Sequence, residues 1–333
     1  MPAPTATDRA GVADAIRVLP HRAMRSLLIS LSHRRSLARI AVRSQLTRPI
    51  VARFVAGETL DEALSAIAAL KRAELHTTVD VLGESVTSPE LATAACDRYV
   101  ATLSALASRG LDPNVSVKLT QMGLEIDPAL CRSNVERILE AARAVGGFVR
   151  FDMEDHTRTD ATLTLWREAH ETYPRTGVVV QSALRRSAAD VEWIVAAGGS
   201  VRLCKGAYAE PRSVAYLNKS TVDANYARLM ERLLTSGSYH AIATHDPRLI
   251  GRAMEITTRE GIDRDRFEFQ MLYGVRRDLQ RMLVRRGFTV RIYVPYGREW
   301  YPYFMRRLAE RPANVGFMLR AIVKEESRRI RGR

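Results

Sequence analysis

Short apolar runs rich in β-branched residues recur along the chain, and a longer segment with helical spacing follows each of them. Such runs are typical of buried strands, whereas apolar residues three and four positions apart are typical of amphipathic helices. The runs that predict strands are Thr77–Leu82, Val115–Thr120, Phe148–Met153, Gly177–Ser182, Ser200–Cys204, His240–Thr244, Arg266–Met271 and Thr289–Val294. Intervening segments such as CRSNVERILEAARAVG and DPRLIGRAMEITTREG predict helices.

This alternation predicts an α/β fold with parallel strands. Right-handed crossovers between such strands leave either an open doubly wound sheet or a closed barrel. Eight strand–helix units favour the closed (β/α)8 barrel of the TIM type. In addition, GESVTS follows the first strand in place of a GxGxxG motif, which counts against a dinucleotide-binding sheet.

Residues 1–70 stand outside this repeat and predict a basic N-terminal helical arm. The apolar residues that share one helical face there are Met24, Leu27, Leu28 and Leu31. A further helix is expected from about Thr59 through Leu70. We therefore expect an arm over residues 1–70 and a catalytic barrel over residues 71–333.

The net charge of +14 is concentrated at the two ends of the chain, in residues 9–53 and 328–333. Basic ends around a near-neutral middle indicate peripheral electrostatics. Residues 9–48 contain no Phe, Trp or Tyr, which counts against the aromatic stacking used in nucleic-acid binding. Three interpretations stay open: a compositional bias towards arginine, contact with an anionic membrane surface and, ranked last, nucleic-acid binding.

Cysteine use and hydropathy bear on the compartment. Cys96, Cys131 and Cys204 form no CxxC pair, and an odd count of cysteines fits a reducing compartment. No stretch approaches the roughly 18 apolar residues of a membrane span. The first residues also lack a charged region followed by an apolar one, so no secretory signal is expected. We expect a cytoplasmic protein, with peripheral contact at the inner face of the cell membrane as the alternative.

Polar residues gather towards the ends of the predicted strands, where barrel enzymes carry their active sites. The residues concerned are Lys118, Asp152, Gln181, Arg202, Lys205, Thr244, His245, Glu268, Gln270 and Tyr293. Each alone would be an ordinary core or packing residue, but their recurrence on successive strands favours a site. Together with Arg306 and Arg307 on the last helix, these cations predict a positive field suited to a carboxylate and a pyrophosphate.

Two other chemistries have little support. His245 has no His or Cys at ligand spacing, so no metal is expected. Nothing resembles a Ser–His–Asp arrangement, and Cys204 has no evident His partner.

A series of motifs, taken in order, resembles the proline dehydrogenases of the monofunctional bacterial type. The motifs are SVKLTQMG, VRFDMED, VVVQSALRRS, VRLCKGAY, ATHD, FEFQMLYGVR and VRIYVPYGREWYPYFMRRLAERPAN. They cover about residues 60 to 322. The combination is specific, although no single fragment would be.

The resemblance implies a distorted (β/α)8 barrel that binds FAD non-covalently. It also implies oxidation of L-proline to Δ1-pyrroline-5-carboxylate, by hydride transfer from proline C5 to flavin N5. Electrons would pass to a quinone, as part of proline catabolism to glutamate. Implied catalytic residues are Asp152, which orients its neighbours more readily than it acts as a base, and Arg202. Implied flavin contacts are Met153, Gln181, Arg202, Lys205, Gly206, Ala207, Thr244 and His245. Implied substrate contacts are Lys118, Tyr208, Tyr293, Arg306 and Arg307.

One position departs from the family pattern, and two other functions stay open. Asp246 follows the Thr-His pair where many relatives have asparagine, and an acid there is unfavourable beside a pyrophosphate. The first alternative is a barrel flavoenzyme that oxidises another cyclic secondary amine, such as hydroxyproline. The second is a basic nucleic-acid-binding protein.

Overall fold

The computed structural model describes residues 51–83 and 86–310. Residues 56–297 form one compact unit, and residues 51–55 and 298–310 belong to a second. The second unit contains helix α13, Trp300–Glu310, in which the Phe304 ring lies 6.1 Å from the Phe54 ring. The helices predicted before residue 50 lie outside the described residues.

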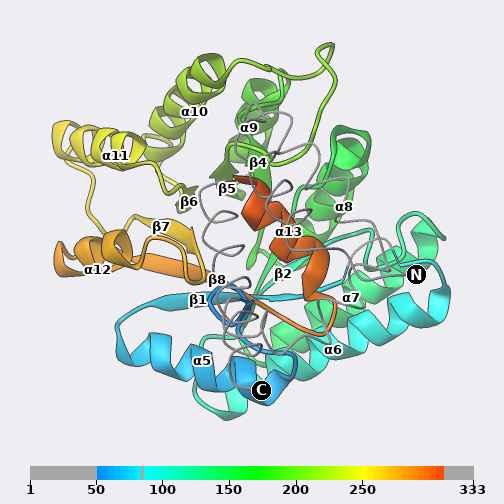
Figure 1. Cartoon of the computed structure of the whole chain (residues 1–333). Helices are drawn as coiled ribbons and strands as arrows, with labels where there is room; N and C mark the ends of the chain where they lie inside the picture. The colour runs from blue at the N-terminus through cyan, green and yellow to red at the C-terminus, as the bar shows by residue number, and fades with distance from the viewer. Residues whose placement is uncertain (1–50, 84–85, 311–333) are drawn as a thin grey trace, which may run out of the picture. The chain divides into compact units, whose positions relative to one another are not determined.

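The first unit is a closed barrel of parallel strands β1 to β8, in which each strand pairs with the next and β8 pairs with β1 (Figure 1). The strands are β1 His76–Val81, β2 Asn114–Val117, β3 Phe148–Phe151, β4 Thr176–Gln181, β5 Ser200–Cys204, β6 His240–Ala243, β7 Phe267–Leu272 and β8 Val290–Tyr296. Every predicted strand is present. The ends of each strand lie within two residues of the prediction, except that β2 ends three residues earlier than predicted. The predicted (β/α)8 fold is therefore confirmed.

One helix, α5 Leu60–Arg72, precedes β1, and the others follow the strands in the predicted alternation. These are α6 Pro89–Ser108, α7 Pro128–Ala144, η1 His156–Arg158, α8 Thr159–Thr172, α9 Ser187–Ala196, α10 Lys219–Leu234, α11 Pro247–Arg259 and α12 Arg277–Arg285. Their starts follow local chemistry: Thr59 and Glu62 form a capping box on α5, and Asp127 caps α7 just before a proline. In the described part of the chain, no helix is long and apolar enough to cross a bilayer.

Alternation along the strands gives the barrel a polar interior. Successive side chains point to opposite faces of a strand, so residues two apart share a face. On β1, Val79 is buried between Thr78 and Asp80, and the side chains of Thr78 and Asp80 both contact side chains from the β2 region. The apolar residues between the polar ones pack into the surrounding hydrophobic core. The barrel is thus lined by hydrogen-bonded and charged groups, unlike one filled mainly with branched apolar residues.

A separate ionic layer lies near the amino ends of the strands. Glu268, the second residue of β7, accepts a hydrogen bond of 2.9 Å from Arg291. Arg291 also pairs with Asp112 at 2.5 Å and donates to the Thr77 carbonyl at 2.7 Å. The expectation that grouped Glu268 with the residues at the carboxyl ends is therefore wrong. Its carboxylate neutralises Arg291, which reaches back to the start of β1.

Candidate active site

Asp152 is the centre of the charged cluster near the carboxyl ends of the strands. It follows β3 directly and is 8% exposed. One carboxylate oxygen accepts from Arg202 Nη1 at 2.7 Å, and the other accepts from the Tyr293 hydroxyl at 2.7 Å. Lys118 Nζ lies 3.5 Å from the second oxygen. The structure therefore brings together four of the predicted residues, from β2, β3, β5 and β8.

Asp80 is the residue that the sequence interpretation missed. Lys118 Nζ lies 2.6 Å from Asp80 Oδ1, closer than to Asp152. Asp80 stands on β1 and is 1% exposed. The signal that could have found it is an aspartate inside the apolar run TTVDVL, because a buried acid needs a partner.

Ser116 and Tyr99 connect this cluster to β2 and α6 through hydrogen bonds. Arg202 Nη2 donates to the Ser116 hydroxyl at 2.8 Å, so both terminal nitrogens of the guanidinium are engaged. The Tyr99 hydroxyl, from α6, donates to the Ser116 carbonyl at 2.8 Å. The guanidinium also lies over the Tyr293 ring, 5.3 Å from its centre. Arg202 is consequently held in one orientation by three different strands.

Burial and charge fix the protonation states here. Burial alone would lower the pKa of Lys118, but Asp80, followed by Tyr293 and Asp152, raises it well above its usual value. Burial, together with the Asp152 and Asp80 carboxylates, raises the pKa of Tyr293 well above its ordinary value. Lys118 therefore stays a cation, and Tyr293 stays a neutral hydrogen-bond donor near neutral pH.

Lys205 is neutralised by two acids. It follows β5, and its Nζ lies 2.6 Å from Asp223 and 3.3 Å from Asp246. With Lys118 paired to Asp80 and Arg202 to Asp152, each of these three cations has a carboxylate partner. The predicted positive field is therefore not produced by these three side chains.

The orientation of Asp246 is set by helix capping. Its Oδ1 accepts from the Arg248 backbone N–H at 3.1 Å and caps α11. Although burial acts in the opposite direction, hydrogen bonds from Arg248 and Lys205 lower the pKa of Asp246 to about 2. The carboxylate is therefore charged but offset by two cations, which reduces its repulsion of an anionic group nearby.

Two observations test whether the residues at the carboxyl ends fit a bound cofactor. Gly206 has φ 107°, and a Cβ there would stand 2.7 Å from Gln181 Oε1, so only glycine keeps the main chain this close. The Nε atom of Arg202 is buried and has no hydrogen-bond partner within the described chain. A buried guanidinium donor without a partner fits a group that brings its own acceptor. The residues present thus fit a cofactor that carries a hydrogen-bond acceptor.

The other residues assigned to a flavin site lie beside these. The Gln181 amide donates to the Glu154 carbonyl at 2.7 Å, and the His245 ring accepts from the Leu272 N–H at 3.0 Å. Thr244 accepts from the Asp246 N–H at 3.1 Å. Met153, Ala207 and Tyr208 come from the same segments that follow β3 and β5. Their contacts with a cofactor or a substrate stay predictions.

Arg306 and Arg307 lie on α13, in the second unit. The Arg307 guanidinium lies 5.1 Å from the centre of the Tyr303 ring. The predicted binding of a substrate carboxylate by these arginines rests on the sequence pattern alone.

Among the described residues, no cluster of three or more His, Cys, Asp or Glu side chains could hold a metal ion.

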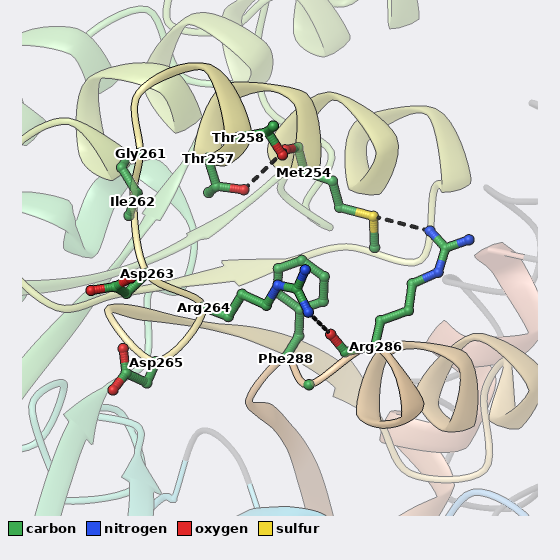
Figure 2. Close-up of a pocket in the computed structure, with 11 residues that line it drawn as sticks. Met254, Thr257, Thr258, Gly261, Ile262, Asp263, Arg264, Asp265, Arg286 and Phe288 are labelled. Atoms are coloured by element: carbon green, nitrogen blue, oxygen red, sulfur yellow. Dashed lines mark hydrogen bonds between the residues drawn. The ribbon is translucent and has the colours of Figure 1, made fainter.

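A surface pocket of about 1010 Å³ lies apart from this cluster (Figure 2). It is formed by the end of α11, the turn from residue 261 to 265, and the residues that follow α12. In a (β/α)8 barrel the helices end beside the amino ends of the strands, opposite the active-site face. This pocket is therefore not part of the candidate active site.

A closed (β/α)8 barrel with a buried ionic cluster at the carboxyl ends of its strands defines a barrel enzyme, and comparison with known proteins narrows the class. Residues 63–320 match the proline dehydrogenase family. The chain belongs to this family. Proline dehydrogenase of Deinococcus radiodurans is 40% identical over 309 residues, which cover 89% of this chain and 100% of the relative. Proline dehydrogenase 1 of Bacillus subtilis is 36% identical over 302 residues, with 91% and 100% coverage.

Solved structures give the same fold. Proline utilization A from Bdellovibrio bacteriovorus, inactivated by N-propargylglycine, is 26% identical with a TM-score of 0.74. The match covers 81% of this chain and 33% of that protein. The chain therefore spans about a third of the length of that structure.

Proposed function

We propose that this protein oxidises L-proline to Δ1-pyrroline-5-carboxylate with FAD as its cofactor and passes the electrons to a quinone. The observation that carries the proposal is the buried network of Asp152, Arg202, Lys118 and Tyr293 in a member of the proline dehydrogenase family. We also propose that it works in the cytoplasm, in peripheral contact with the inner face of the cell membrane.

The residues that would hold FAD are those that follow β3 to β6. They are Met153, Gln181, Arg202, Lys205, Gly206, Ala207, Thr244 and His245. When bound, FAD supplies the redox chemistry by accepting the hydride that leaves C5 of proline. The support is the match of these positions to the family pattern, together with the glycine requirement at residue 206 and the unpartnered Nε of Arg202.

The main task of the protein's own residues is orientation. Asp152 and Ser116 fix the Arg202 guanidinium, so its unpartnered Nε–H points in one direction without reorganisation during the reaction. Lys118 and Tyr293, joined by a 3.2 Å contact, would line the pocket for the proline ring and its carboxylate. Such pre-organisation holds reacting groups in near-attack geometry.

The carboxylate of proline needs positive charge beyond this network. Asp80 and Asp152 carry two negative charges, and Lys118 and Arg202 carry two positive ones, so the four groups cancel. Arg306 and Arg307 are the residues that would supply the missing charge, because a guanidinium binds a carboxylate through two parallel hydrogen bonds. Tyr208 would add an aromatic contact.

The test begins with the absorbance of the purified protein. A flavin spectrum that proline bleaches under anaerobic conditions is the expected result. Colourless protein that binds oligonucleotides would favour the nucleic-acid alternative and overturn the proposal. Bleaching rates with proline, hydroxyproline and pipecolate then separate the substrates, and proline should be fastest. Reoxidation by a soluble quinone, faster than by oxygen, tests the acceptor.

A further inference from the structure

The segment between β5 and α10, residues 205–218, is a long loop that carries several positions assigned to the cofactor or the substrate (Figure 1). These positions are Lys205, Gly206, Ala207 and Tyr208. In this fully described segment, the one piece of regular pairing is a single bridge between Ala215 and Leu184. The placement of the segment at the barrel therefore depends on contacts made by individual residues.

The second half of the segment is anchored to the residues that follow β4. The Arg185 N–H donates to the Val214 carbonyl at 2.9 Å, and the Tyr216 N–H donates to the Ala183 carbonyl at 2.8 Å. The Arg185 guanidinium also lies 4.7 Å from the centre of the Tyr216 ring. After leaving β5, the segment thus reaches the end of the neighbouring strand before it returns to α10.

Glu210, in the first half of the segment, is anchored one strand further away, on the residues that follow β3. One carboxylate oxygen accepts from the His156 backbone N–H at 3.0 Å, and the other lies 2.5 Å from His156 Nδ1. The Glu210 side chain is 5% exposed, whereas Pro211 and Arg212 beside it are exposed. Burying a carboxylate is unfavourable unless its oxygens are hydrogen-bonded, so this contact is what stabilises an acid here. We call it the Glu210–His156 clasp.

The short helix η1, which begins at His156, has other contacts that account for its own structure. Asp155 caps it by accepting from the Thr157 N–H at 3.0 Å. Arg158, at its end, pairs with Glu125 from the segment between β2 and α7. Because these contacts already hold η1 in place, the added effect of Glu210 is to tie the segment after β5 to the segment after β3.

The clasp joins two groups of positions assigned to the cofactor site. Met153 stands three residues before one end of the clasp, and Tyr208 stands two residues before the other. Between them, at the end of β4, the Gln181 amide donates to the Glu154 carbonyl at 2.7 Å. The segments after three adjacent strands, β3, β4 and β5, are therefore connected to each other at the carboxyl ends of the barrel.

We propose that the Glu210–His156 clasp holds residues 205–208 in place for the cofactor, which makes Glu210 and His156 positioning residues for flavin binding. The inference rests on the proposed function, because it takes FAD to be the group that residues 205–208 contact. The physical reason is preorganisation: a loop that is fixed before binding loses less conformational entropy when the cofactor arrives. Neither side chain has to touch the flavin for this effect.

Limited trypsin digestion of the full-length protein measures the clasp itself, independently of the proposed chemistry. Trypsin cleaves after arginine, and the exposed Arg212 lies two residues beyond Glu210. Glu210→Ala removes two hydrogen bonds to a charged group, so cleavage after Arg212 should become about tenfold faster as the opened segment is more populated. The matched control is Glu125→Ala, which removes a partner of η1 but leaves the clasp intact. Its cleavage after Arg212 should stay close to the native rate.

Release of FAD from the diluted holoenzyme, followed by the fluorescence of free flavin, measures the consequence for the cofactor. Glu210→Ala should release FAD about tenfold faster, because the energy of the clasp is lost from the preorganised site. Glu125→Ala should release it at nearly the native rate. A carboxylate only accepts hydrogen bonds, so His156→Asn, which keeps the backbone N–H and offers a side-chain N–H, should restore most of the retention.

Each outcome has a separate meaning. Unchanged cleavage after Arg212 in Glu210→Ala would overturn the clasp. Faster cleavage with unchanged FAD release would overturn its role in the cofactor site, and so would equal effects in Glu125→Ala, since any disturbance of η1 would then suffice. Native protein without flavin would overturn the proposed function instead, while the digestion would still report on the clasp.

Discussion

At the scale of single residues, the geometry of the site depends on which carboxylate each cation pairs with. Lys118 pairs with Asp80 at 2.6 Å, and this leaves both oxygens of Asp152 to Arg202 and Tyr293. Asp80 acts as a positioning residue, since it acts through Lys118. The sequence pattern placed Lys118 and Asp152 among the polar residues towards the strand ends and did not point to Asp80. It could not rank the two acids, since their distances depend on how three strands come together.

Asp80→Asn should disturb catalysis through Lys118. The neutral amide cannot hold the pKa of Lys118 as high, so the basic limb of the kcat/KM profile for proline should move to lower pH. Removing one partner of a buried pair should also lower the free energy of unfolding by about 3 kcal/mol. Urea unfolding and steady-state kinetics across pH measure both effects.

Two controls make this prediction specific. Asp61→Asn removes an acid whose side chain is 83% exposed and pairs with Arg109, so it should change neither quantity. Asp80→Asn with Lys118→Met removes both charges and should regain stability without regaining activity. An unshifted pH profile in Asp80→Asn would show that Asp80 has only a structural role.

Arg202→Ala should impair the cofactor site. It removes the unpartnered Nε donor and releases Asp152, which leaves a buried carboxylate without its guanidinium. We expect lower flavin content, or at least a hundredfold slower reduction by proline, as for the loss of one pre-organised donor of about 3 kcal/mol. Absorbance of the purified variant and anaerobic stopped flow measure the two. Normal flavin content with normal reduction would remove Arg202 from the mechanism.

At the scale of elements, strand alternation and helix capping account for most of the local structure, and one strand start also makes the stability of the fold depend on pH. This residue is His240, the first residue of β6. Its Nδ1 accepts from the Val201 N–H at 3.0 Å, and its Nε2 lies 2.8 Å from the Ser236 hydroxyl. Burial, with help from Arg150 and Arg232, lowers the pKa of His240 to about 3. The ring is therefore neutral in the folded state while the unfolded chain binds a proton below about pH 6.5.

The sign follows from proton binding. Between pH 6.5 and 3 the unfolded state holds more protons than the folded state, so stability falls as pH falls. Moving from about pH 7 to about pH 5 should cost about 2 kcal/mol at this residue. His240→Gln should lose stability at pH 7 but show a smaller decline towards pH 5. Urea unfolding at both pH values measures it, and equal declines in both proteins would contradict the assignment.

At the scale of the whole molecule, the proposed binding of the substrate carboxylate rests on residues that the barrel unit does not carry. The four buried charges near Asp152 cancel, and the arginines assigned to the substrate lie on α13 in the other unit. Arg306→Met with Arg307→Met should therefore raise the KM for proline about a hundredfold and leave the flavin bound, because a carboxylate loses its charged partners. Arg132→Met with Arg137→Met, two exposed arginines on α7, is the control. Unchanged KM would refute the carboxylate role.

The sequence by itself determined the alternation of strands and helices along the chain and the family to which the chain belongs. Strand positions and helix starts follow from hydrophobic spacing and capping residues, which are local and can be read in order. The closed barrel was predicted from the count of eight strand–helix units. The motifs around Asp152, Arg202 and Lys205 identified the family before any geometry was known.

Only the tertiary structure decided how the charges pair. In the folded chain, Asp80 lies beside Lys118, and Lys205 contacts two carboxylates. Glu268 lies near the amino ends of the strands, where it pairs with Arg291. The physical reason is that the two kinds of pattern depend on different separations along the sequence. Hydrophobic alternation acts between residues a few positions apart, whereas an ion pair depends on angstrom distances between strands that are far apart in the sequence.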